Sequence, residues 1–280
     1  MFLLKKVNTF SMRDYFELFD DGFLSGKLAE SEQKIIMEEG KATLSRAKRE
    51  DDTVYFASSK ECVIANDKLE SSFVTLTQMA LKRIFKQFGI TKKHLVMVVG
   101  IGNEGLTADS LGARVVEKVI VTAHLDNLRG KGNLCAYAPG VGGNTGIASF
   151  DVIKALVEKL EPKVIICIDT LASKSIERLG GVIQIKDSGL TPGAGVGNAK
   201  IPLEQSTLGV PVIGVGVPLI IYARNLLLNY LAGSSSNLSF DTLSEVTGDL
   251  VVTAKEIDLY IDCFSKIISK AINKAVHGKI

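Results

Sequence analysis

Two carboxylates, Asp109 and Asp169, lie where this sequence can support acid and base chemistry. Asp169 directly follows an apolar run at residues 164–168, which predicts a strand buried on both faces. Asp109 follows a loop that leaves a second apolar run, at residues 94–99. Because ligands bind at the carboxyl ends of parallel strands, we expect both side chains to face one crevice. Of two carboxylates in a partly dry cleft, one can hold a proton while the other activates water.

Each carboxylate also has a simpler structural explanation. Asp169 is well placed to cap a helix expected at about residues 171–179. Asp109 begins a helix expected at about residues 109–118, where the helix dipole stabilises a negative charge. The sequence leaves these explanations open beside the catalytic one.

Histidine and cysteine offer little alternative chemistry. The histidines are His94, His124 and His277, and the cysteines are Cys62, Cys135, Cys167 and Cys263. No Cys-x-x-Cys pair and no Cys/His spacing suits a zinc site. Cys167 lies inside an apolar run, where a small buried side chain is a simpler explanation than a reactive thiol. The sequence therefore favours carboxylate chemistry.

Glycine-rich loops accompany the carboxylates. Gly100, Gly102 and Gly105 have the spacing of a dinucleotide-binding loop, but the acidic residue that should follow is missing from the right context. A tight turn that carries the backbone past a substrate explains this loop better. A second glycine loop covers residues 139–145. A third, at residues 187–200, lacks the ending of a Walker phosphate loop and contains the candidate residues Gly193, Gly195, Gly197 and Asn198.

The elements that must position these residues alternate between buried strands and helices. Strands are expected at 94–99, 164–168 and 210–217, and helices at 109–118 and 145–160, with Pro218 opening another helix. This order predicts an α/β fold, a three-layer sandwich whose mostly parallel sheet is flanked by helices.

The remaining segments are expected as follows. A helix is expected at 30–39, a charged connection at 41–52, a pair of strands at 53–57 and 62–65, and a helix at 72–88. A surface loop is expected at 232–237, and a final helix at 254–277.

Length and composition limit the classes of protein. The 280 residues allow one large domain or two small ones, and 46% hydrophobic with 23% charged residues indicates a globular chain. No segment approaches the roughly 20 apolar residues of a membrane helix, so a cytoplasmic protein is expected. The formal charge of +2 argues against a nucleic-acid-coating surface, although one basic face is compatible with it.

Several motifs, in order along the chain, resemble the germination protease family of spore-forming bacteria. One begins with Gly-Ile-Gly-Asn at 100–103 and continues through Asp109 to residue 112. Another is Ile-Asp-Thr-Leu-Ala-Ser-Lys-Ser at 168–175. The others lie at residues 121–125, 138–146, 184–198, 207–218 and 251–258. The likeness covers roughly residues 95–280, so residues 1–90 are expected to be a divergent segment that packs on a catalytic domain at 91–280.

This resemblance implies an aspartic-type endopeptidase that degrades small acid-soluble spore proteins at germination. It implies a fold similar to that of the hydrogenase-maturation endopeptidases, and it assigns the proposed catalytic pair to Asp109 and Asp169. It also implies a zymogen that loses an N-terminal segment, a homo-oligomer (a tetramer) and a location in the cytoplasm of the spore core. No cofactor, metal, membrane or direct nucleic-acid contact is implied.

Other residues are candidates for supporting roles. Asn103 orients a carboxylate or the developing oxyanion in this hypothesis, although a turn-forming Asn explains it equally well. Lys174 is a cation close to Asp169 in sequence, or simply a surface lysine. The remaining candidates are His124 and Ser173 as supporting residues, with Gly102, Gly105, Gly193, Gly195 and Gly197 in substrate loops.

Two other functions stay open. One is a metal-dependent maturation endopeptidase, in which Asp109, Asp169 and His124 would bind a divalent ion. The other is a spore-assembly protein without catalytic activity. Survival of activity after chelation would exclude the first, and a failure to cleave any spore protein would favour the second.

Overall fold

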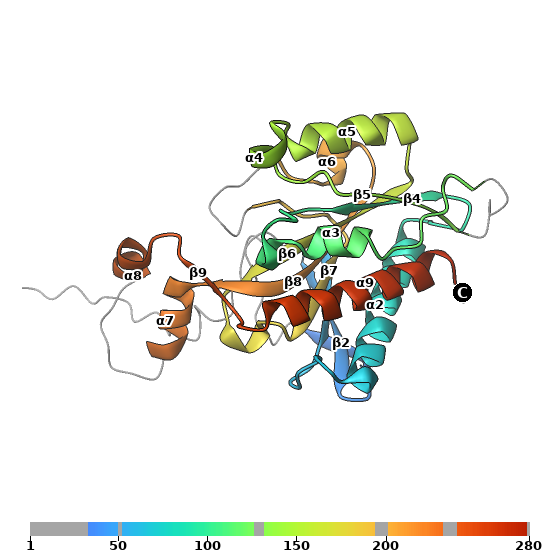
Figure 1. Ribbon diagram of the computed structural model, residues 1–280. Coiled ribbons are helices and arrows are strands. Elements are labelled where there is room, and N and C mark those ends of the chain that lie inside the picture. The colour runs from blue at the N-terminus through green and yellow to red at the C-terminus, as the bar shows by residue number, and fades with distance from the viewer. Residues whose placement is uncertain (1–32, 50–51, 126–131, 194–200, 232–239, 279–280) are drawn as a thin grey trace, which may run out of the picture.

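The described part of the computed structural model comprises residues 33–49, 52–125, 132–193, 201–231 and 240–278. It is an α/β fold built on one mixed sheet, with helices on both faces (Figure 1). The strands are β1 (Lys34–Glu39), β2 (Ala42–Arg49), β3 (Asp52–Ser58), β4 (Leu95–Gly100), β5 (Asn133–Tyr137), β6 (Val164–Ser173), β7 (Val182–Lys186), β8 (Val212–Tyr222) and β9 (Val251–Thr253).

The sheet has a parallel part and an antiparallel part. Its order is β1-β2-β3-β7-β8-β6-β4-β5, with β9 pairing β8. The pairs β5–β4, β4–β6 and β6–β8 are parallel, as expected, and these strands bring their carboxyl ends to one edge. Strands β1, β2, β3, β7 and β9 add antiparallel pairs that the sequence analysis did not foresee.

Helices form the two outer layers. The α-helices are α2 (Asp67–Gln87), α3 (Leu111–Val116), α4 (Gly142–Thr145), α5 (Ser149–Leu160), α6 (Gln205–Leu208), α7 (Ala223–Leu231), α8 (Phe240–Thr247) and α9 (Ile257–Val276), and short 3-10 turns are η2 (Thr107–Asp109) and η4 (Ile176–Arg178). Helices α2, α3 and α9 cover one face, and α5 and α6 cover the parallel strands on the other (Figure 1). The alternation of strand residues divides the core accordingly: Ile166 and Ile168 face α9, whereas Ile165 and Cys167 face α5.

Local chemistry explains the long helix α2. The side chain of Asn66 caps its start by accepting a hydrogen bond from the backbone N–H of Leu69 (3.1 Å), so the helix begins five residues before the expected start at 72. Its buried residues, including Phe73, Leu76 and Ile84, recur at helical spacing and pack against the sheet and α9.

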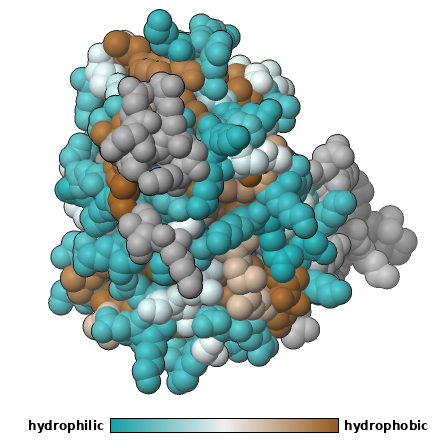
Figure 2. Space-filling model, turned by 90° about the vertical axis from the view of Figure 1, so that its right-hand side faces the viewer, coloured by the Kyte–Doolittle hydropathy of each residue, from teal (hydrophilic) through white to brown (hydrophobic). Residues whose placement is uncertain are grey.

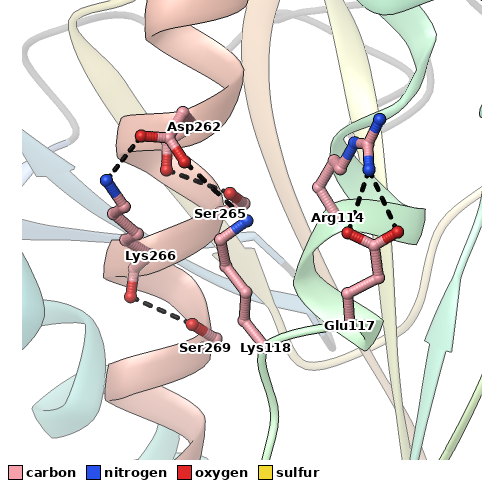
Figure 3. A network of polar contacts seen from close by, with 7 residues as sticks. All are labelled: Arg114, Glu117, Lys118, Asp262, Ser265, Lys266 and Ser269. Carbon is pink, nitrogen blue, oxygen red and sulfur yellow. Dashed lines mark hydrogen bonds and ion pairs between the residues drawn. The ribbon is translucent and has the colours of Figure 1, made fainter.

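Polar contacts join α3 to α9 at the surface (Figure 3). Asp262 of α9 pairs with Lys266 in its own helix and with Lys118 just after α3 (3.8 Å). The hydrogen bond from Lys266 and the charges of both lysines hold the pKa of Asp262 below its usual range. About three turns farther along α9, the amide oxygen of buried Asn273 accepts the backbone N–H of Ile120 (2.9 Å).

Several expectations for the first 65 residues are wrong. Residues 34–39 form strand β1 instead of a helix, and 42–49 form β2 instead of a charged connection. Residues 62–65 form no strand, whereas the strand expected at 53–57 is present as β3. The helix at 72–88 and the final helix at 254–277 are confirmed, with bounds shifted by a few residues. The loop expected at 232–237 lies outside the described residues.

Pro218 does not open a helix. It lies inside β8, and α7 begins only at Ala223. On one edge of β8, residues 214–216 pair with β7 and residues 220–222 pair with β9. Pro218 lies between these two segments, so its missing N–H interrupts neither pairing. The β6 register also shifts next to it, after Leu171.

Candidate active site

A cleft of about 680 Å³ opens at the carboxyl edge of the parallel strands. Both Asp109 and Asp169 line it. Its other walls come from the glycine segment 140–147, the start of α5, and residues on either side of the loop after β7, namely Pro192, Gly193, Ile201 and Leu203. The two carboxylates that the sequence singled out therefore share one cavity.

Strand β6 presents Asp169 to the cleft. Asp169 is 7% exposed and pairs in the sheet with Gly216 of β8. One carboxylate oxygen accepts the backbone N–H of Thr170 (2.8 Å). Because β6 continues to Ser173, the helix expected at 171–179 is absent, and the helix-capping explanation for Asp169 is wrong.

The turn after β4 holds Asp109. Its carboxylate accepts the backbone N–H of Asn103 (2.8 Å), which closes the loop onto the end of η2. Gly102 has φ +113° and packs so tightly that an added Cβ would lie 2.0 Å from the carbonyl oxygen of Asp109. Asp109 precedes the N-cap residue Ser110, and α3 has no side-chain cap, so N-capping does not explain this carboxylate.

Close packing of β4 on α3 supports this turn. A Cβ on Gly100 would lie 2.2 Å from the carbonyl oxygen of Gly112. Glycine at both positions lets the helix approach the strand end closely, and the approach places Asp109 beside the strand that carries Asp169. Gly100 therefore serves helix packing, and Gly102, at φ +113°, forms the tight turn that the sequence analysis preferred over a nucleotide site.

Asn103 forms the turn with its side chain. Its amide oxygen accepts the backbone N–H of Gly105 (3.0 Å) and the side-chain amide of Asn144 (3.2 Å). The second bond links the loop after β4 to the glycine segment on the opposite wall. Asn103 contacts Asp109 through its backbone, so the turn-forming explanation is the one that the structure supports.

The other predicted residues are distributed more widely. Gly193 lines the cleft with φ +70°. Gly195, Gly197 and Asn198 lie outside the described residues. Ser173 and Lys174 lie beyond the cleft lining: Ser173 donates to the carbonyl of Ser175 (2.7 Å), and the Lys174 carbonyl accepts the side-chain amide of Asn229 (2.9 Å).

His124 lies away from the carboxylates. It is exposed in a turn whose neighbour Thr122 bonds to Gly132 and Leu134, at the amino end of β5. The carboxylates lie at the opposite edge of the same parallel strands. Within the part of the chain that is described, no three His, Cys, Asp or Glu side chains gather in a way that could hold a metal ion. The ligand set of the metal-dependent alternative is therefore not assembled.

Sequence reasoning missed the apolar wall of the cleft. Ile147, Phe150 and Ile201 line it, and Ser149 supports it by donating to the carbonyl of Gly140 (2.8 Å). These residues lie on loops and a helix start, where no periodic pattern identifies a buried or a ligand-facing side. The glycines at 140–146 are the only nearby signal that the sequence carries.

The chain was then compared with known proteins. The family model described as germination protease matches residues 29–232. A germination protease of Clostridium acetobutylicum is 37% identical over 227 residues, covering 70% of this chain and 69% of its own length. Those of Clostridium tetani (35%, covering 72% of both chains) and Bacillus cereus (33%, covering 74% of this chain and 75% of its own) are also similar.

The matched range contains every described residue that lines the cleft, and it begins at residue 29, well before the motifs that first suggested the likeness. A germination protease is a peptidase, and the α/β framework here carries a cleft with two carboxylates. The chain belongs to the germination protease family.

Proposed function

We propose that this chain is an aspartic-type endopeptidase that hydrolyses small acid-soluble spore proteins, with Asp109 and Asp169 as its acid and base. The observation that carries the proposal is that both carboxylates line one cleft in a member of a peptidase family. The cleft-lining residues lie between 101 and 203, inside the catalytic domain proposed at 91–280, whereas the described part of residues 1–90 adds β1–β3 and α2 to the same sheet and core.

The exposure of the two residues supports a division of roles. Asp169 is 7% exposed, whereas Asp109 is only partly buried. Because burial favours the neutral form of a carboxyl group, we assign the protonated role to Asp169 and the ionised role to Asp109. Asp169 then donates a hydrogen bond to the scissile carbonyl, and Asp109 removes a proton from the attacking water.

The proton balance closes within this pair. The water oxygen bonds to the carbonyl carbon and gives one proton to Asp109, and the carbonyl oxygen takes negative charge that Asp169 stabilises. Collapse of the tetrahedral intermediate breaks the C–N bond, and the proton held by Asp109 passes to the leaving amine. The apolar wall formed by Ile147, Phe150 and Ile201 limits the water around these charges.

Purified protein incubated with small acid-soluble spore proteins, followed by mass spectrometry of the fragments, tests this proposal. Asp109→Asn and Asp169→Asn should each lower turnover by about 100-fold or more, because each removes one partner of the proton transfer. Asp151→Asn is the matched control, since Asp151 is exposed on α5 outside the cleft lining.

Circular dichroism and thermal melting should show that all three variants fold. Near-normal turnover by Asp169→Asn would refute the two-carboxylate mechanism. A wild-type protein that cleaves no spore protein would favour the non-catalytic alternative.

The resemblance carries three further parts of the proposal: a homo-oligomer (a tetramer), removal of an N-terminal segment from a precursor, and action in the cytoplasm of the spore core. Among the helices of the described ranges, none is both long and apolar enough to cross a bilayer. Sedimentation equilibrium tests the tetramer, and mass spectrometry of the N-terminus from spores before and after germination tests the processing.

A further inference from the structure

Positive charge is concentrated in two stretches of the sequence that lack acidic residues. Residues 71–103 contain five Lys and Arg and no Asp or Glu, and residues 263–280 contain four Lys and no Asp or Glu. The rest of the chain then holds 24 basic and 31 acidic residues. The overall charge of +2 therefore conceals a strong asymmetry.

The fold brings these two stretches together. Helix α2 occupies the first and α9 the second, and they pack side by side with their carboxyl ends at the same end of the molecule: Glu70 pairs with Lys270, and farther along Gln78 donates to the carbonyl of Lys274 (3.2 Å). Lys92 then donates to the carbonyl of His277 (3.1 Å). We call this region the basic end and define it by Lys82, Arg83, Lys86, Lys92, Lys93 and Lys274, all exposed.

The basic end has a hollow with an apolar floor and a cationic rim. A cavity of about 390 Å³ is lined by Lys82, Lys86 and Lys92 over apolar residues such as Phe85 and Val276. Lysine stems can lie on such a floor while their ammonium groups stay in water. Figure 2 faces this end of the molecule and shows that hydrophilic side chains cover most of it.

Two acidic residues near this end, both in the described ranges, already have partners. Asp187 is buried and accepts hydrogen bonds from the Thr53 N–H (2.8 Å) and from Gln87 (3.1 Å). Asp52 pairs with Lys186 (3.0 Å). Lys163 also lies at this end, where its backbone N–H donates to the carbonyl of Leu95. Because nearby Glu161 offsets its positive charge, Lys163 is not included in the basic end. Interactions with helix carboxyl ends account for Lys86 and Lys274 in the last turns, and for Lys92, which donates to the C-cap residue of α9. They do not account for Lys82, Arg83 and Lys93.

We propose that the basic end binds the phosphate backbone of nucleic acid. Several lysines around one hollow neutralise closely spaced phosphates and release counterions, which is the main source of sequence-independent affinity. Strand β4 separates this surface from the cleft, because its six residues run from the basic end to the site over about 20 Å. Only a substrate segment about six or more residues away from the cleaved bond would reach these lysines, so the basic end is a surface separate from the cleft. The distribution of charge thus supports a contact that the net charge alone argued against.

Fluorescence anisotropy of a labelled random DNA duplex of about 20 base pairs, titrated with the full chain between about 50 and 200 mM salt, tests this proposal. The variant Lys82→Gln/Lys86→Gln/Lys93→Gln should bind at least about tenfold more weakly, and its plot of log K against log salt should be flatter by about 3. The control variant Lys60→Gln/Lys68→Gln/Lys255→Gln also removes three positive charges, but two of them, at Lys68 and Lys255, lie near the amino ends of α2 and α9. It should bind the duplex like the wild type.

A second variant, Lys92→Gln/Lys93→Gln, changes residues outside both helices and should flatten the plot by about 2. Equal weakening by the control, or no salt-dependent binding by the wild type, overturns the proposal. Stronger binding to poly-glutamate than to the duplex at equal charge concentration also overturns it, in favour of an acidic protein partner. None of these results depends on peptidase activity, so they are independent of the proposed function.

Discussion

Gly102 determines how closely the loop after β4 approaches Asp109. Replacement by alanine should be costly because φ +113° is unfavourable for an L-residue and because the new Cβ would meet the Asp109 carbonyl. We expect Gly102→Ala to lower kcat/KM for spore-protein cleavage by about 100-fold through displacement of Asp109. Initial rates across substrate concentration measure this effect.

Gly209 provides the control at the same scale. Its φ is +76°, but a Cβ there would meet nothing within 4 Å. Gly209→Ala should therefore cost only the backbone strain, about 1–2 kcal/mol of unfolding free energy, with kcat/KM unchanged. If both variants lose activity equally, backbone strain and not the contact with Asp109 explains the loss.

The four thiols should differ in reactivity. Burial raises the pKa of Cys135 and of Cys263 to about 11, and complete burial raises the pKa of Cys167 further. Since only the thiolate reacts, these three thiols should stay unlabelled by iodoacetamide at about pH 8, whereas exposed Cys62 reacts. Mass spectrometry should find one adduct, none in Cys62→Ser, and unchanged peptidase activity. An adduct on Cys167 in the folded protein would contradict the observed burial.

At the scale of elements, the junction of α9 with α3 contains one buried contact and one exposed contact, and their contributions to stability can be compared. Asn273→Ala removes the acceptor for the Ile120 N–H inside the junction and should cost about 1–3 kcal/mol of unfolding free energy. Asp262→Asn removes an ion pair whose carboxylate side chain is 53% exposed, so solvent screening should limit its cost to less than about 1 kcal/mol. Urea denaturation of both variants measures the difference.

The pH dependence of that ion pair follows from the lowered pKa of Asp262. The folded protein binds this proton less tightly than the unfolded chain, so the contribution is complete above the unfolded pKa of 3.8. It is lost as pH falls through the lower folded value. Wild type and Asp262→Asn should therefore converge in stability at acid pH, and a difference that grows below pH 3.8 would contradict the assignment.

The sequence predicts elements well where burial leaves a clear pattern. The apolar runs of β4 and β6 and the helical spacing of α2 and α9 depend on a core that covers them fully. Strand β2 was missed because Arg46 and Lys48 are exposed along it and its buried residues change face. Ala42 and Leu44 are buried on one face, and Ser45 and Ala47 on the other. The missed signal is the two-residue turn Gly40-Lys41, where Gly40 has φ +58° and Glu39 pairs directly with Ala42.

In the candidate site, only the residues that directly follow parallel strands could be placed from the sequence. Asp109 and Asp169 follow strands whose direction the βα order determines, so their shared cleft could be inferred. The path of the segment after Asp187 could not, because β7 runs antiparallel to β8 and its carboxyl end therefore points toward the edge opposite the cleft. Pro192 and Gly193 reach the site by crossing back over the sheet, which no local pattern encodes.

At the scale of the whole molecule, the candidate metal ligands lie at opposite edges of the sheet. His124 is at the amino end of β5, and the carboxylates are at the carboxyl ends. We therefore expect spore-protein cleavage to survive exhaustive dialysis against EDTA, measured beside a zinc peptidase that loses its activity. Loss of cleavage that is restored by one added divalent ion would contradict the two-carboxylate mechanism.

Helix α9 has a consequence for how the protein is made. It packs against α2 and α3, which precede it by more than a hundred residues, and its Phe264, Ile268 and Ile272 close the core beneath the sheet. During synthesis this face of the sheet, already contacted by α2 and α3, therefore stays partly uncovered until α9 has left the ribosome. The described cleft residues are all translated by then, yet the helical layer behind the sheet still lacks α9. A nascent chain of this protein should thus depend on chaperones and should acquire activity only after α9 has docked.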